Sequence, residues 1–181
     1  MINEPVTSDR PPASLLRRVG AMVSDLLVVV GLMLLGTLMF VPVLNHLGAK
    51  AMTPSEAGWF WSVIYWSWLL CIWMLFFVFF WSRSGQTVGM RAWRLRVEGE
   101  SGRLLTWPQA VTRLWAGTIP WLPGLLAMGI AEQLGSGMLK YVGQGLFLLG
   151  VSGFMSMCLD PLRRTWHDRI THSRVILLPK L

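Results

Sequence analysis

Between Arg18 and Lys50 the chain carries only one charged side chain, that of Asp25. The residues that follow it, from Leu26 to Leu44, are predominantly apolar, and about 20 such residues in a helix cross the hydrocarbon core of a bilayer. This segment therefore predicts a membrane-spanning helix. A carboxylate in such a helix costs about 3 kcal/mol at mid-depth and less near the interface. Asp25 must gain compensating contacts from the rest of the fold.

The composition places the whole chain in the membrane class. Of its 181 residues, 54% are hydrophobic and 14% are charged, and 11 are Trp. The mean hydropathy is +0.52. We expect a single transmembrane domain over residues 14–181, preceded by a disordered N-terminal tail at residues 1–13 that contains three prolines. The two cysteines lie in apolar runs and form no CxxC, so neither a disulfide framework nor a metal site is expected.

Four apolar segments predict four membrane spans, at about residues 19–44, 57–81, 114–131 and 141–159. The distribution of Lys and Arg supports this number. Three lie before the first span, six in the loop at 82–113, five in the tail at 160–181 and one in each remaining loop. Four spans place 14 of the 16 on one side, which the positive-inside rule makes cytoplasmic. The fold class expected is therefore all-α, with four transmembrane helices and both termini cytoplasmic.

The net charge of +7 then lies on one membrane face, where anionic lipid headgroups are the expected partner. No base-reading or stacking motif accompanies the basic residues, so nucleic acid is not expected to bind.

The loop at 82–113 is patterned as a small cytoplasmic β-hairpin. Apolar side chains at positions 93, 95 and 97 alternate with arginines, which is typical of a half-buried strand. Gly-Glu-Ser-Gly at 99–102 predicts a turn, and Leu104 and Leu105 predict the start of a return strand. Thr106 and Gln109 have the spacing of a capping box, which predicts a helix that continues through Arg113 into the third span.

Three ordered motifs carry a resemblance to a known family. The first runs from Arg18 to Asp25 in the form R-x-x-A-x-x-x-D, and the second is Gly-Gln-Thr-Val-Gly-Met-Arg at 85–91. The third is Trp-His-Asp-Arg at 166–169, followed by Ser173 and Val175. Together they resemble the RDD family of bacterial membrane proteins, named for an Arg and two Asp, which here match Arg18, Asp25 and Asp168. The resemblance covers residues 17–176, and it implies a multi-pass protein of the bacterial inner membrane with a suspected transport role.

Arg18 and Asp25 are seven residues apart, so they share a helix face but lie about 10 Å apart along the axis. They are not expected to pair directly. Asp25 would lie in the cytoplasmic third of the membrane, near a basic group from another segment. The basic candidates on that face are Arg91, Arg113, His167 and Arg169. Small residues at positions 20, 21 and 24 predict that another segment approaches this face of the helix closely.

Two functions are open from the sequence. The first is a small ion or solute transporter with a polar site open to the cytoplasm, where Asp25 would bind a monovalent cation or a proton. The residues of that site would be Arg18, Asp25, Arg91, Arg113, His167 and Asp168. A chain with only four spans would need a homo-oligomer to enclose a pathway.

The alternative is a non-catalytic membrane scaffold or accessory subunit, in which the Arg and Asp residues form a structural lock. Asp25 would then fix the first helix to the loop through a buried Arg, and His167 and Asp168 would be a surface polar pair. Neither function requires a cofactor or a metal. No nucleophile–base arrangement is visible, so enzymatic activity is not expected.

Overall fold

The computed structural model describes residues 11–47, 58–158, 160 and 163–179 of the chain. The longer helices form two hairpins, and shorter elements join them. The hairpin helices are α1 (Leu15–His46), α2 (Trp59–Arg83), α5 (Leu122–Leu134) and α6 (Gly137–Met155). The shorter elements are α3 (Val88–Ala92), β1 (Leu95–Gly99), α4 (Trp107–Thr118), η1 (Ser156–Cys158), α7 (Trp166–Ile170) and β2 (Ser173–Leu177).

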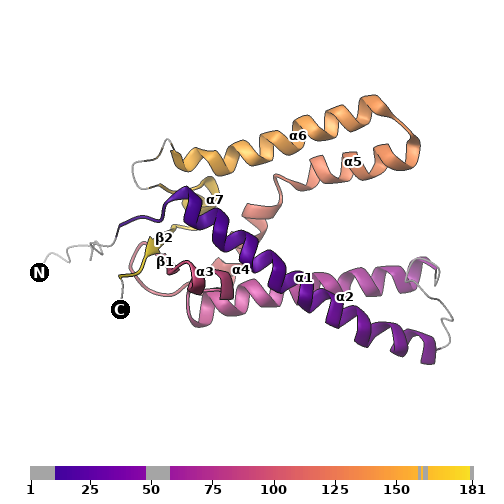
Figure 1. Ribbon diagram of the computed structural model, residues 1–181, viewed down its shortest axis with the longest axis horizontal. Helices are drawn as coiled ribbons and strands as arrows, with labels where there is room; N and C mark the ends of the chain where they lie inside the picture. Colours follow the sequence, from indigo (N-terminus) through magenta and orange to yellow (C-terminus); the bar gives the residue numbers. More distant parts are fainter. Residues whose placement is uncertain (1–10, 48–57, 159, 161–162, 180–181) are drawn as a thin grey trace, which may run out of the picture.

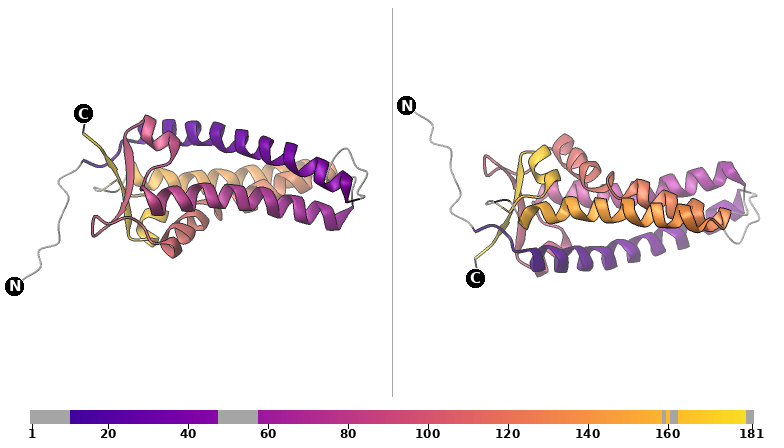
Figure 2. Two further views of the ribbon diagram at one scale, coloured as in Figure 1. Left: turned by 90° about the horizontal axis from the view of Figure 1, so that it is seen from below. Right: turned by 90° about the horizontal axis from the view of Figure 1, so that it is seen from above.

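Both helical hairpins extend from one end of the molecule, where α3, β1, α4, α7 and β2 gather (Figure 1). We call these five short elements the platform. The α1–α2 hairpin and the α5–α6 hairpin diverge as they leave it (Figure 1). Both described ends of the chain, at Pro11 and Pro179, lie at the platform end, as the two rotated views also show (Figure 2).

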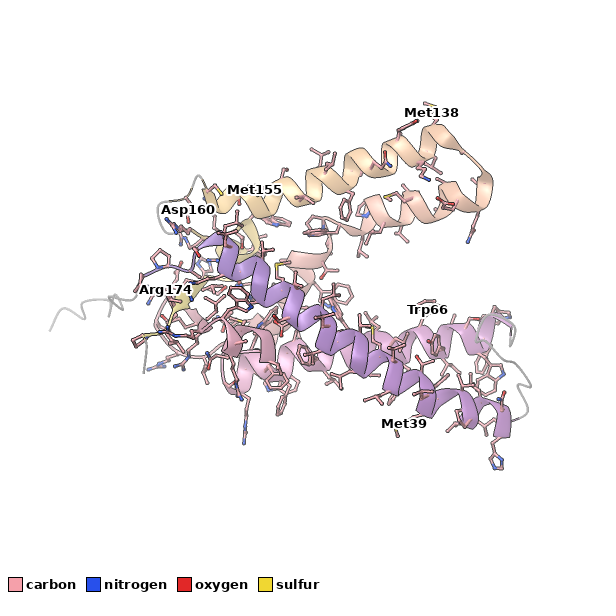
Figure 3. All side chains as sticks on the ribbon, viewed as in Figure 1. Met39, Trp66, Met138, Met155, Asp160 and Arg174 are labelled. Atoms are coloured by element: carbon pink, nitrogen blue, oxygen red, sulfur yellow. The ribbon has the colours of Figure 1, made fainter. Side chains whose placement is uncertain are left out.

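Helices α1 and α2 are long and apolar enough to cross a membrane. The bent pair α4 and α5 adds a third candidate span if the two helices are taken as one. The described residues thus provide two or three candidate spans by length and composition, where the sequence predicted four. Away from the platform, α1, α2 and α6 expose apolar side chains, among them Met39, Trp66 and Met138 (Figure 3). Such surfaces are expected of helices in contact with lipid.

The third predicted span is broken. Helix α4 ends at Thr118, α5 begins at Leu122, and the two are bent by 48°. Pro120 lies in the break, and a proline inside a helix removes a backbone donor and clashes with the preceding turn. Helix α5 then pairs closely with α6. A Cβ on Gly124 would lie 2.5 Å from the backbone N of Phe147, so only glycine permits this approach.

The platform sheet has two antiparallel strands, β1 and β2. Leu95 lies opposite Leu177, and Val97 lies opposite Val175. The predicted hairpin with a return strand at Leu104–Leu105 is therefore wrong, because β1 pairs with the C-terminal tail. Local turn signals could not indicate a partner more than 70 residues away in sequence.

The other local predictions in this loop are confirmed. Residues 99–102 form a turn in which the Gly102 N–H donates to the Gly99 carbonyl at 2.9 Å. Helix α4 begins at Trp107, and the Gln109 side chain accepts a hydrogen bond from the Thr106 N–H at 3.0 Å. This capping box fixes where α4 begins and so helps to place Arg113 about two turns later.

The segment before α1 joins the sheet. Pro12 bridges Ile176, and the Ala13 N–H donates to the Val175 carbonyl at 3.1 Å. Ala13 is fully buried. Residues 11–13 of the predicted disordered tail are therefore paired with β2, while residues 1–10 lie outside the described part of the chain.

The hydrophobic core lies where the platform meets the first turns of α1 and the last turns of α2. It includes Ala21, Val78, Met90, Leu95 and Val97. Leu95 and Val97 are on the inner face of β1, as the alternation predicted, whereas Trp93 precedes the strand and is exposed. This core packs the loop, the tail and α1 against one another.

Candidate functional site

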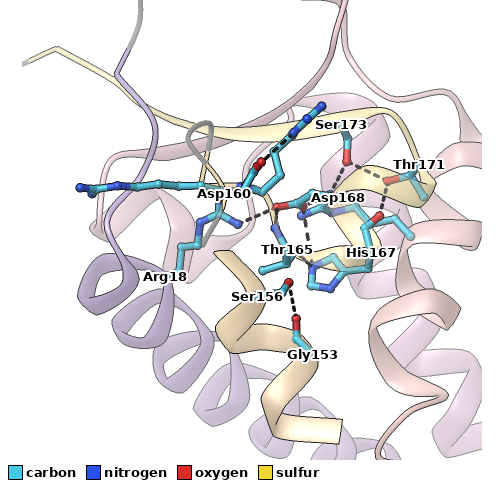
Figure 4. Close-up of polar contacts among 12 residues, drawn as sticks. Arg18, Gly153, Ser156, Asp160, Thr165, His167, Asp168, Thr171 and Ser173 are labelled. Carbon is cyan, nitrogen blue, oxygen red and sulfur yellow. Dashed lines mark hydrogen bonds and ion pairs between the residues drawn. The ribbon is translucent and has the colours of Figure 1, made fainter. Parts of the chain in front are cut away.

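Asp168 is the centre of a buried ionic cluster in the platform. Its carboxylate is fully buried on α7. Arg18 of α1 donates from Nη1 to Oδ2 at 2.7 Å, and Nη1 of Arg113, on α4, lies 2.5 Å from Oδ1 (Figure 4). Both arginine side chains are about 95% buried. The Asp168 carboxylate thus joins α7 to both α1 and α4.

Local structure holds Asp168 in place. Thr165 caps α7, and its N–H donates to Oδ2 of Asp168 at 3.0 Å. Thr at the N-cap with an acid three residues later is the capping-box arrangement. Arg18 also donates from Nη2 to the Arg163 carbonyl at 2.7 Å. Of the two interpretations left open from the sequence, the surface polar pair is wrong for Asp168, because this residue is buried and faces inward from a capped turn.

Arg113 makes contacts with three other elements. Besides Asp168, it donates to the hydroxyl of Ser173 on β2. Its guanidinium lies 5.3 Å from the centre of the Trp81 ring at the end of α2. We call Arg18, Arg113, His167, Asp168 and Ser173 the Asp168 cluster. The cluster links α1, α4, α7 and β2, and through Trp81 it reaches α2.

The electrostatics of the cluster favour the ionised carboxylate. Burial alone would raise the pKa of Asp168, but the guanidinium groups of Arg113 and Arg18 outweigh it and hold that pKa well below its usual range. Breaking such a pair leaves a buried charge without compensation, which is more costly than losing a surface ion pair.

His167, in contrast to Asp168, favours its uncharged form. Burial, reinforced by the charge of Arg113, lowers the pKa of His167 to about 4 from 6.5, although Asp168 partly opposes this shift. Its Nε2 lies 2.9 Å from the Thr165 hydroxyl. His167 is therefore neutral at pH 7 and serves as a hydrogen-bonding group beside the ion pairs.

This shift predicts that acid lowers the stability of the protein. Between about pH 6.5 and pH 4 the unfolded chain binds a proton at His167 that the folded chain does not, so stability falls by about 3 kcal/mol as the pH decreases. The thermal midpoint in detergent, measured from pH 8 to pH 4, should decline below pH 6.5. His167→Gln should remove most of that decline. An unchanged decline in this variant would show that another group causes it.

Asp25 forms a separate cluster with the first turn of α3. The Thr87 hydroxyl donates to Oδ2 of Asp25 at 2.5 Å, and the Gly89 N–H donates to Oδ1 at 2.8 Å. Asp25 is buried, as are Thr87 and Gly89. A Cβ on Gly89 would lie 2.9 Å from Cγ of Asp25, so a glycine is needed for this approach. We call these three residues the Asp25 cluster.

The sequence-based prediction of a basic partner for Asp25 is wrong. Within the described part of the chain, Asp25 forms no ion pair, because the loop supplies a hydroxyl and a backbone N–H instead. Arg91 is exposed and takes no part in either cluster. The prediction that Arg18 and Asp25 do not pair directly is confirmed, since Arg18 binds Asp168. Arg18, Arg113, His167 and Asp168 are the predicted residues that come together.

The close approach predicted on α1 is confirmed. The Trp93 ring lies against Gly20, where any Cβ would overlap it, and Trp93 Nε1 donates to the Ser24 hydroxyl at 3.2 Å. Ala21 is buried beneath α3. Small residues on α1 thus make room for the α3 segment.

Sequence reasoning missed Thr87, Gly89, Thr165 and Ser173 as site residues. The Thr-x-x-Asp spacing of 165 and 168 was a visible capping signal. Thr87 and Gly89 belong to a motif that was noted, yet nothing local indicated that they would face Asp25.

Both carboxylates are occupied by donors of the same chain, which leaves neither as an open ligand for an ion. Within the described residues, His, Cys, Asp and Glu side chains form no group of three that could hold a metal. The geometry therefore suits the joining of helices better than the binding of a cofactor.

A comparison with protein-family models gives a match to the model described as RDD family, over residues 12–172. The matched range contains the Asp25 cluster, every residue of the Asp168 cluster except Ser173, and every element from α1 to α7. No curated protein and no solved structure matches the chain.

Proposed function

This chain belongs to the RDD family, and we propose that it acts in the membrane as a non-catalytic scaffold or accessory subunit. Its Arg and Asp residues would hold the platform rigidly against the membrane helices, and the platform would be the surface presented to partners.

The observation that carries this proposal is that both carboxylates are held by partners from other elements of the chain. Asp168 is bound by two arginines and a backbone N–H, and Asp25 by a hydroxyl and a backbone N–H. Apart from the Thr165 N–H, these partners lie more than 50 residues away in sequence from the carboxylate that they bind. Buried polar groups that are held by several elements at once give a fold rigidity and specificity.

We propose a topology of four spans with the platform on the cytoplasmic side of a bacterial inner membrane. The placement of 14 of the 16 Lys and Arg residues on one side supports it. A further support is that both described ends of the chain lie at the platform end, as an even number of spans requires. Helices α5 and α6 would be the third and fourth spans, with α4 completing the third.

Transport remains a second candidate function because of one feature of Asp25. It is a buried carboxylate in an apolar helix, without a basic partner among the described residues. Such residues often mark ion or proton pathways. The broken helix at Pro120 is also of a kind that lines transporter sites.

Purified protein in liposomes separates the two functions. With a pH dye inside and imposed Na⁺ or K⁺ gradients outside, the scaffold proposal predicts the same proton flux as protein-free liposomes. Cation-dependent flux that disappears in Asp25→Asn, with the variant still folded, would overturn the scaffold proposal and support transport.

A further inference from the structure

The platform end of the molecule carries positive charge that the acidic residues there do not neutralise. In the described part of the chain, its acids are already paired with basic side chains: Glu98 with Arg174, Glu100 with Arg164, Asp160 with Arg164 and Arg169, and Asp168 with Arg18 and Arg113. Seven described arginines form no ion pair there: Arg17, Arg83, Arg91, Arg94, Arg96, Arg103 and Arg163. They leave this end of the molecule with a net positive charge, which attracts anions.

Two of these arginines lie beside α1 where the platform meets it. Arg17 is in the first turn of α1 and donates from Nη1 to the Trp93 carbonyl at 3.4 Å. Arg91 is in the last turn of α3, two residues before Trp93, and is exposed. The Asp25 cluster fixes α3 against α1, so it also fixes where Arg91 is presented.

Trp93 places an apolar ring next to Arg17 and Arg91, on the side of them that is further along α1. Its ring lies on Gly20 and its Nε1 bonds to Ser24, one to two turns further along α1 than Arg17. The side chain is 38% exposed, and Val23 and Leu27, on the side of α1 that carries Gly20 and Ser24, are also exposed. Tryptophans with a bonded N–H and an apolar ring favour the boundary between headgroups and acyl chains.

We infer that Arg17, Arg91 and Trp93 form a binding site for an anionic phospholipid. The two guanidinium groups would contact the headgroup phosphate, and Trp93 with its exposed apolar neighbours would contact the start of the acyl chains. Charge complementarity and the position beside a membrane-spanning helix favour a lipid over a free anion, which would gain nothing from the apolar surface. This inference rests on the proposed orientation of the platform toward the membrane surface.

Native mass spectrometry of the whole protein in a neutral detergent tests the site. The probe is phosphatidylglycerol, with phosphatidylcholine of the same chain length as the headgroup control and inorganic phosphate as the free-anion control. We expect retained phosphatidylglycerol on the wild type, with binding about fivefold weaker for Arg17→Gln or Arg91→Gln and about 25-fold weaker for both together. The double Arg→Lys variant should keep most of the binding because it keeps the charges.

Arg103→Gln is the matched control, since Arg103 is also exposed and free of ion pairs among the described residues, but lies in the turn after β1. It should bind the lipid like the wild type. An equal loss in Arg103→Gln, no loss in the double Gln variant, or complete competition by inorganic phosphate would overturn the inference. If the double Gln variant binds the lipid as the wild type does, an acidic protein partner would be the alternative ligand of these two arginines. Failure here leaves the scaffold proposal intact, because that proposal is tested by flux in liposomes and by the stability of the Asp168 variants, not by lipid binding.

Discussion

Replacing Asp168 with Asn is expected to lower the free energy of unfolding by about 3–5 kcal/mol, the usual cost of breaking a buried ion pair. The reason is that Arg18 and Arg113 would both remain buried without a counter-charge, and an amide cannot offset two guanidinium groups. The loss should be visible as reduced resistance to unfolding in SDS-containing micelles and as a lower thermal midpoint.

Glu132→Gln is the control for Asp168→Asn, because it also breaks an ion pair, Glu132 to Lys140 at 3.0 Å, but an exposed one. Its expected effect is below about 1 kcal/mol. If Asp168→Asn does not accumulate, Arg18→Lys provides a milder test. It keeps the charge but cannot reach both Asp168 and the Arg163 carbonyl as a guanidinium does. Equal stability of Asp168→Asn and Glu132→Gln would contradict the structural role of the cluster.

Asp25→Ala is expected to destabilise the protein by about 3 kcal/mol. It leaves the Thr87 hydroxyl and the Gly89 N–H buried without their acceptor, and each such group costs about 1–3 kcal/mol. Asp25→Asn should lose only about 1 kcal/mol, since its amide oxygen can still accept from Gly89 and its NH₂ can donate to Thr87. Unfolding in SDS-containing micelles measures both losses.

Val23→Ala is the matched control for Asp25→Ala, because Val23 lies on the same turn of α1 and is 54% exposed. It should lose less than about 1 kcal/mol. The comparison of Asn with Ala at position 25 also bears on function. A hydrogen-bond acceptor tolerates Asn, whereas a group that must carry an ion or a proton does not. Asp25→Asn as unstable as Asp25→Ala would mean that the charge itself is required.

Local signals were enough to predict most of the fold. The apolar runs predicted α1 and α2, the capping box at Thr106 predicted the start of α4, and the alternation around Leu95 predicted β1. The partner of β1 was not predictable in this way. The strand at 173–177 is short, and its pairing is fixed by the packing of Val97 against Val175 in a shared core rather than by a nearby turn.

The sequence predicted which residues form the site better than it predicted which groups those residues contact. Arg18, Arg113, His167 and Asp168 were named from charge and motif, and they do come together. Asp25 was expected to need a basic side chain as its partner, because a buried carboxylate usually does. Instead it uses the Thr87 hydroxyl and a backbone N–H that only the fold of α3 brings within reach. Backbone donors have no signature in side-chain patterns, which is why this partner was missed.

The central claim, that Asp168 and the arginines act as a structural unit, is tested most directly by a double-mutant cycle of Arg18→Met and Asp168→Asn. The free energies of unfolding of the wild type, both single variants and the double variant are measured in SDS-containing micelles. The account predicts a coupling energy of about 2 kcal/mol, with the double variant clearly more stable than the sum of the single losses implies. Losses that add to within about 0.5 kcal/mol would contradict it.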